Sequence, residues 1–151
     1  MDGLKPGLLH GRLGCHVAIT DADSIQARRE AVVKAHIDAE AVHHDVAATV
    51  ATFHHPRYEV PALAVTADGG DAVHGLVGGL LSAFPDFYVH TTALHHAEKA
   101  VIVEARFGGT QRGVWAGIEP AGKRMEVQCV LIFVFEGSNL VCERVYFDHG
   151  T

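Results

Sequence analysis

The stretch MEVQCVLIFVFEGSNLVCERVYFD, residues 125–148, decides the fold class of this chain. Its first half places an apolar side chain at every second position, at Met125, Val127, Cys129, Leu131, Phe133 and Phe135. Such alternation predicts a long strand over Met125–Phe135 with one face in a core. The Glu-Gly-Ser-Asn sequence at 136–139 predicts a hairpin turn, and Leu140–Asp148 predicts the strand that returns beside it.

Two more strands are predicted before this hairpin, over Phe87–His96 and Ala100–Phe107. Ala100–Phe107 alternates in the same way as the stretch above. The connection after it contains Trp115, the only tryptophan of the chain, between glycines. The region from residue 87 onward therefore reads as a meander of antiparallel strands.

Helices are predicted only before residue 85. Residues 20–53 contain no proline or glycine, and acidic residues with Ser24 at their start suit a helix N-terminus. The polar sequence at 43–45 predicts a break, followed by a shorter helix from about Asp45 to Phe53. Residues 58–65 are predicted to be extended. Helices followed by antiparallel strands indicate an α+β fold.

A third helix is predicted from about Asp71 to Phe84, where Pro85 ends it. One face carries apolar residues at helical spacing. The other face carries Gly75, Gly78 and Gly79, and an interior glycine costs about 1 kcal/mol relative to alanine. Either another part of the chain approaches that face closely or the helix is weak.

Length and composition predict one domain over residues 19–151 behind a loose N-terminal extension over residues 1–18. The net charge is −6 without a basic stripe, so no nucleic-acid partner is expected. The cysteines, Cys15, Cys129 and Cys142, form no CxxC pair, which disfavours a disulfide scaffold or a zinc ribbon. No signal peptide and no apolar run of about 20 residues is present, so we expect a cytoplasmic protein without membrane contact.

Four motifs, read in order, resemble the SnoaL-like polyketide cyclases, a branch of the NTF2-like superfamily. They are Phe84-Pro85-Asp86, Gly109-Thr110-Gln111-Arg112-Gly113, the turn Gly117…Gly122-Lys123, and Gly137…Glu143-Arg144…Asp148. Family members commonly read F-P-D, G-T-H-x-G, a glycine-rich turn and G-K-I-x-E-x-W…D. The resemblance covers about residues 22–148, and Gln111 stands where the family motif has histidine.

The resemblance implies an NTF2-like cone, in which three N-terminal helices pack into a strongly curved antiparallel sheet and enclose an apolar pocket. Family activities include intramolecular aldol ring closure of polyketide esters. Relatives in the superfamily isomerise ketosteroids, hydrolyse epoxides or only bind ligands. Members commonly form dimers through the outside of the sheet.

The last strand contains the candidate catalytic residues. Its period of two places Arg144, Tyr146 and Asp148 on one face and Glu143 on the other. The resemblance implies that the Asp148 face lines the pocket, so we expect Asp148 to act as general acid or base. Arg144 or Tyr146 would orient or polarise a carbonyl group, and Glu143 would lie on the outer side. The alternative is a structural Asp148–Arg144 pair.

Five further residues are candidates for ligand binding: Trp115, Tyr58, His54, His90 and Glu126. Trp115 either closes the pocket mouth and stacks on a flat ligand, or packs in the core or a dimer interface. Glu126 either turns inward as a second carboxylate or is solvated. The twelve histidines include no HExxH motif and no helical i, i+4 histidine pair beside a carboxylate, so no metal site is expected.

Several functions remain open from the sequence. The first is a cofactor-free cyclase or isomerase that acts by acid–base chemistry on a small apolar carbonyl compound. The second is a non-catalytic module that binds a small ligand. An epoxide hydrolase-like enzyme would need an Asp–Arg–Asp grouping, of which only Asp148 and Arg144 are visible. We expect a homodimer, because apolar residues on both faces of the last two strands leave one face to be covered.

Overall fold

The computed structural model of the chain describes residues 21–148. The predicted N-terminal extension and Cys15 lie outside this range. Within it, no helix is long and apolar enough to cross a membrane. Three helices and a six-stranded sheet account for most of the fold, which is α+β as predicted.

The helical region follows the predicted pattern, including its break. Helix α1 (Asp21–Ile37) continues directly into a π-helical turn, η1 (Asp38–Val42). Helix α2 (Val46–Ala51) begins after Asp45, whose carboxylate accepts a hydrogen bond from the Ala48 N–H at 2.9 Å. An aspartate in this N-cap position satisfies a backbone donor that the first helical turn leaves free.

Helix α3 (Gly70–Ala83) buries Val73 and Val77 and leaves most of its glycine face open. Added Cβ atoms at Gly75 and Gly78 would meet nothing within 4 Å. An added Cβ atom at Gly79 would lie 3.6 Å from the Trp115 ring. A Cβ atom would therefore fit at all three positions, because 3.6 Å is an ordinary contact distance, and the glycines weaken this helix face.

The sheet has the strand order β2-β1-β6-β5-β4-β3. Its strands are β1 (Arg57–Val60), β2 (Val65–Asp68), β3 (Tyr88–Ala97), β4 (Ala100–Thr110), β5 (Arg124–Glu136) and β6 (Asn139–Phe147). The predicted extended segment at 58–65 is interrupted by a 3₁₀ turn, η2 (Pro61–Leu63), so it forms a strand and the start of the next.

One strand pairing corrects the expectation of an antiparallel sheet. Strand β1 pairs with β6 in parallel, with Tyr58 opposite Glu143 and Glu59 opposite Arg144. All other pairings are antiparallel, so the sheet is mixed. The parallel pairing joins segments that are far apart in the sequence, and no local pattern could have predicted it.

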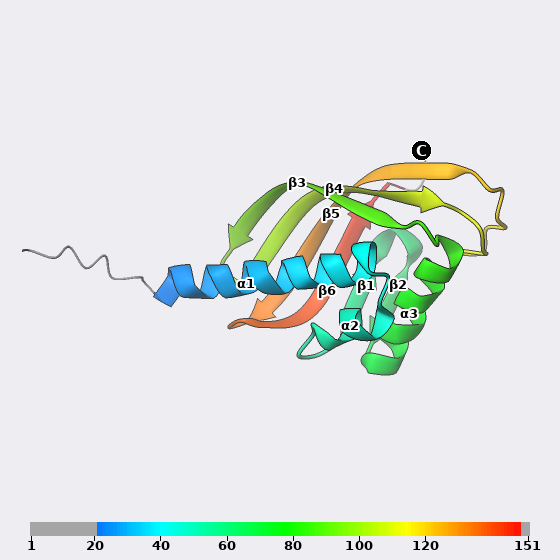
Figure 1. The fold of residues 1–151 in the computed structure, drawn as a ribbon. Helices are drawn as coiled ribbons and strands as arrows, with labels where there is room; N and C mark the ends of the chain where they lie inside the picture. Colours follow the sequence, from blue (N-terminus) through cyan, green and yellow to red (C-terminus); the bar gives the residue numbers. More distant parts are fainter. Residues whose placement is uncertain (1–20, 149–151) are drawn as a thin grey trace, which may run out of the picture.

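The helices lie on one face of the curved sheet, and α1 crosses that face (Figure 1). The core between them contains the predicted inner face of β5, where Leu131, Phe133 and Phe135 are buried. The opposite face of β5 carries Val130 and Ile132, which are half-buried in the single chain. The homodimer expected from this outer face stays a prediction.

A buried arginine fixes the position of α1 on the sheet. The Arg29 guanidinium donates hydrogen bonds to the carbonyl groups of Gly137 at 2.8 Å and Glu98 at 3.1 Å. It also lies over the Phe135 ring, 5.4 Å from its centre. Because both carbonyl groups belong to hairpin turns, this contact aligns α1, and with it His36 two turns later, against the ends of four strands.

Candidate functional site

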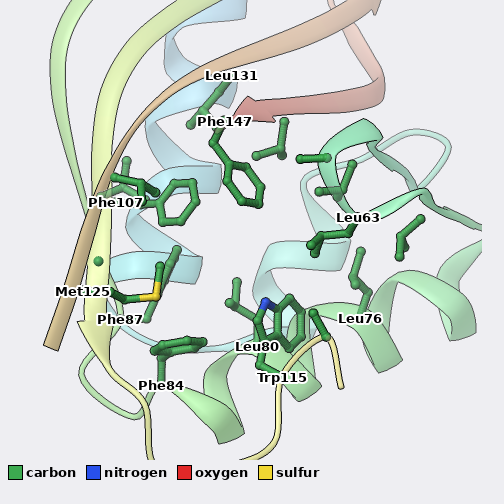
Figure 2. A pocket seen from close by; sticks show the side chains of 18 of the residues that line it. Leu63, Leu76, Leu80, Phe84, Phe87, Phe107, Trp115, Met125, Leu131 and Phe147 are labelled. Atoms are coloured by element: carbon green, nitrogen blue, oxygen red, sulfur yellow. The ribbon is translucent and has the colours of Figure 1, made fainter. Parts of the chain in front are cut away.

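A cavity of about 1480 Å³ lies between the helices and the inner face of the sheet. Figure 2 shows its apolar walls, which α3, β4, β5, β6 and the connections around them supply. The labelled lining residues are Leu63, Leu76, Leu80, Phe84, Phe87, Phe107, Trp115, Met125, Leu131 and Phe147. An apolar cavity with a few polar groups is the usual form of a small-molecule site.

The polar groups at the buried end of this cavity come from three distant segments. Glu40 of η1, Tyr58 of β1 and Glu143 of β6 line it. The side chain of His36 lies behind them and is 1% exposed, whereas Tyr58 and Glu143 are 4% and 3% exposed. The i, i+4 spacing of His36 and Glu40 on one helical path places both beside the parallel β1–β6 pair.

The hydrogen bonds around His36 are consistent with donation from both of its ring nitrogens. The Thr52 hydroxyl gives its proton to the Thr49 carbonyl at 2.7 Å, so its oxygen accepts from His36 Nδ1, also at 2.7 Å. The Tyr58 hydroxyl donates to Glu40 Oε2 at 2.6 Å, so its oxygen accepts from His36 Nε2 at 2.7 Å. A ring that donates at both nitrogens is an imidazolium.

The charges around the ring agree with this protonation state. Burial works against a charged ring, yet the carboxyl groups of Glu143 and Glu40 raise the pKa of His36 from 6.5 to about 9. Burial also raises the pKa of Tyr58 well above its ordinary value, and the same two carboxyl groups add to that effect. The phenol is therefore a neutral hydrogen-bond donor.

Glu143 is the buried carboxyl group without a complete set of partners. Its Oε2 lies 2.9 Å from His36 Nε2, but no hydrogen bond to this atom is aligned within the described part of the chain. Burial raises the pKa of Glu143, His36 and the nearby Tyr58 hydroxyl oppose that effect, and Glu40 adds to it. A buried carboxyl oxygen without a donor is costly as an anion, which favours its protonated form.

Ligand atoms of His36, Glu40 and Glu143 lie within 4.8 Å of one another, close enough for one metal ion to bridge them. Zinc ligands lie about 2.0–2.2 Å from the ion. The Tyr58 hydroxyl, 2.7 Å from His36 Nε2 and 2.6 Å from Glu40 Oε2, takes up space between these donors. Hydrogen bonding accounts for this arrangement better than metal coordination does.

The two faces of β6 are reversed relative to the prediction. Glu143 lines the cavity, together with Val145 and Phe147. Arg144 and Tyr146 lie on the opposite face, where Arg144 Nε donates to Glu59 Oε2 at 2.8 Å and Tyr146 is 43% exposed. The physical reason is the parallel pairing, which sets Glu143 beside the inward-facing Tyr58.

Two of the remaining candidates line the cavity mouth. Asp148 lies there in an exposed position, just after Phe147. Glu126 lies at the exposed part of the same rim, where it accepts hydrogen bonds from the Tyr88 hydroxyl and, at 3.4 Å, from Arg106. The bond from Tyr88 lowers the pKa of Glu126, so this group is an ionised surface carboxylate.

The ligand-binding candidates divide into two groups. Trp115 and Tyr58 line the cavity. His54 and His90 are exposed and are not part of its lining, because His90 lies on the outer face opposite Arg106. The sequence interpretation considered His36 only as a histidine that could face the pocket from the helical side, and it did not propose Glu40 or Glu143 as site residues. A polar i, i+4 pair within an otherwise apolar helix stripe was the signal that could have found His36 and Glu40.

The family model SnoaL-like polyketide cyclase matches residues 26–151. No curated protein gives a significant match.

Solved structures with this fold share little sequence with the chain. A phenazine biosynthesis-related protein from Pseudomonas aeruginosa has a TM-score of 0.71 at 13% identity, covering 85% of this chain and 84% of its own. A hypothetical protein with a ketosteroid isomerase-like fold from Catenulispora acidiphila, in complex with trimethylamine, has a TM-score of 0.67 at 19% identity, covering 78% and 85%. An NTF2-like protein of unknown function from Burkholderia pseudomallei has a TM-score of 0.67 at 16% identity, covering 80% and 91%.

The structural neighbours establish the NTF2-like fold, and the family model covers most of the chain. The resemblance predicted from the motifs is therefore confirmed. The chain belongs to the SnoaL-like polyketide cyclase family.

Proposed function

We propose that the protein is a cofactor-free enzyme that moves protons on a small apolar carbonyl compound, as a cyclase or isomerase does. One observation carries this proposal: an apolar cavity of about 1480 Å³ ends at two buried carboxyl groups held around one imidazolium. Apolar walls select a hydrophobic molecule, and a buried carboxyl group whose pKa is raised, Glu143, supplies acid–base chemistry.

The charge count of the buried group supports the proposal. With both glutamates ionised and His36 protonated, Glu40, Glu143 and His36 would carry a net charge of −1 in an apolar interior. Such a charge is costly, and one additional proton removes it. Glu40 already accepts from Tyr58, whereas Glu143 Oε2 has no aligned donor. The additional proton therefore belongs on Glu143.

These protonation states assign complementary roles. Glu143, as a neutral acid facing the cavity, donates its proton to the carbonyl oxygen of the substrate. Glu40, as the carboxylate, removes a proton from the adjacent carbon, and an enol results. The enol then attacks a second carbonyl carbon of the same molecule, or takes a proton back at another carbon. Glu40 gives the proton that it removed to the new alkoxide oxygen or to that other carbon, and the O–H of the former enol returns its proton to Glu143, so the enzyme is unchanged. His36 and Tyr58 position both carboxyl groups.

The test measures proton transfer without knowledge of the natural substrate. The probe is 2-tetralone in D₂O, whose exchange of C–H for C–D beside the carbonyl is followed by NMR. Wild-type protein should accelerate this exchange. Glu143→Gln keeps the shape but has no acidic proton, so the acceleration should fall at least about 100-fold, the usual lower range for general acid–base catalysis.

The matched control is Asp148→Asn, which changes the carboxylate at the cavity mouth in the same way. We expect this variant to lose less than about tenfold, because an exposed carboxylate is not desolvated. Loss of exchange in Asp148→Asn but not in Glu143→Gln would instead move the acid–base role to Asp148. Binding of 2-tetralone without any accelerated exchange would favour a ligand-binding module.

A further inference from the structure

A short hairpin lies across the mouth of the cavity, between β4 and β5. Trp115 and Ile118 exchange both backbone hydrogen bonds, at 3.2 and 2.9 Å. The two residues between them, Ala116 and Gly117, have φ angles of 52° and 75°. Positive φ at both central positions is typical of the type I′ turn, which closes the tightest hairpins.

The side chain of Gln111 holds this hairpin in place. Its Nε2 donates to the carbonyl groups of Gly113 at 3.1 Å and Ile118 at 2.9 Å. The backbone N–H groups of Arg112 and Gly113 both donate to the Ala83 carbonyl at the end of α3, at 2.7 and 3.2 Å. The base of the hairpin is therefore anchored to α3, and Gln111 ties its two strands together.

An amide suits this role better than the histidine of the family motif. The glutamine NH₂ group carries two hydrogens on one nitrogen, so it can reach two carbonyl groups at once. An imidazole ring offers one N–H at each nitrogen, and the two nitrogens point in different directions.

The consequence of this anchoring is the position of Trp115. Its indole ring lies beside Leu80 at the edge of the cavity, with the nitrogen on the side that faces the cavity (Figure 2). The ring passes 3.6 Å from the Cβ position of Gly79, so α3 supports it from behind. At this edge the indole N–H is a donor that an acceptor group of a ligand can meet.

We propose that Gln111 is a positioning residue that holds Trp115 across the cavity mouth and so determines which flat apolar molecules are retained. The inference rests on the proposed function only in taking the cavity as the substrate site. Trp115 is the residue that contacts the ligand, by stacking and through its N–H. Gln111 acts through the hairpin and does not need to touch the ligand.

The experiment uses the fluorescence of Trp115, which is the only tryptophan of the full chain. The variant Gln111→Met keeps the length of the side chain and removes both donors. Its emission should shift to longer wavelength, because a released ring is more exposed to water. Its affinity for 8-anilinonaphthalene-1-sulfonate, a flat apolar probe, should fall about fivefold or more, as expected when hydrogen bonds that hold the binding form are lost.

Two controls separate positioning from general damage. Gln26→Met changes an exposed glutamine on α1 and should leave emission and probe affinity unchanged. Trp115→Phe should lower the affinity for the probe. Adding Gln111→Met to Trp115→Phe should lower this affinity no further, because the two residues act as one unit.

Wild-type emission and probe affinity in folded Gln111→Met would overturn the proposal. If circular dichroism shows that this variant does not fold, Gln111→Asn decides the question, because it keeps the amide but is too short to reach both carbonyl groups. The same two changes are expected in Gln111→Asn, and their absence would count against the proposal. Neither measurement depends on turnover. If the protein does not accelerate proton exchange, the proposed function fails, but the emission and affinity results still test the role of Gln111.

Discussion

Two neighbouring residues of β6 form side-chain contacts of almost the same length on opposite sides of the sheet. Glu143 lies 2.9 Å from His36, and Arg144 lies 2.8 Å from Glu59. The side chains of His36 and Glu143 are 2% and 5% exposed, whereas those of Arg144 and Glu59 are 41% and 25% exposed. Distance alone therefore does not set the strength of a contact between two titratable side chains, because water screens the outer contact and not the inner one.

The two pairs also differ in which groups can compensate when one partner is removed. The outer pair belongs to a surface network in which Arg57 contacts Glu59 at 3.0 Å and Asp68 at 3.1 Å. Water and these neighbours can take over a lost partner. The inner pair has no such compensating groups, because removing His36 leaves two carboxyl groups in an apolar interior.

The variant His36→Gln should have the largest effect on folding. It removes the cation between Glu40 and Glu143, and breaking a buried pair by deleting one partner typically costs about 3–5 kcal/mol. Urea denaturation at pH 7 measures this cost. The matched control is His90→Gln, an exposed histidine on the outer face, which should change the free energy of unfolding by less than about 0.5 kcal/mol. Equal effects of the two variants would contradict the comparison.

The pH dependence of stability should show the inner pair in the wild-type protein. The pKa of His36 is raised to about 9 in the folded chain from 6.5, so the folded state keeps a proton that the unfolded state releases. This stabilisation is complete below pH 6.5 and is lost as pH rises through 9. The difference is roughly 3 kcal/mol at 1.36 kcal/mol per pKa unit.

The raised pKa of Glu143 has the same sign, because it also makes the folded state hold more protons. Urea denaturation between pH 6 and pH 9.5 measures the slope. His36→Gln should lack most of it. A wild-type stability that does not fall over this interval would show that His36 is not held as an imidazolium.

Much of the fold followed from local patterns. The alternation from Met125 to Phe135 predicted β5 to within a residue at each end, and the polar residues at 43–45 predicted the break before α2. These features depend on neighbours in the sequence, which a periodic pattern records directly. The parallel β1–β6 pairing depends on contacts between residues 58 and 143, and no local pattern reports it.

The site was harder to predict for the same reason. A period of two separates Glu143 from Arg144 but does not say which of them faces inward. The apolar residues Val145 and Phe147 share the face of Glu143, and this was the local signal for the inner side. His36 and Glu40 become site residues only because β1 and β6 meet beside them.

The smallest effect is expected for the outer pair, and a double-mutant cycle isolates it. Arg144→Met and Glu59→Gln, alone and together, should give a coupling energy below about 1 kcal/mol in urea denaturation, the range of exposed pairs. Added salt should reduce it further, because exposed charges are screened. The same cycle with His36→Gln and Glu143→Gln should give a larger coupling that responds little to salt. A coupling at Arg144 as large and as salt-resistant as that at Glu143 would mean that water reaches neither pair, and burial would then not distinguish the two faces of β6.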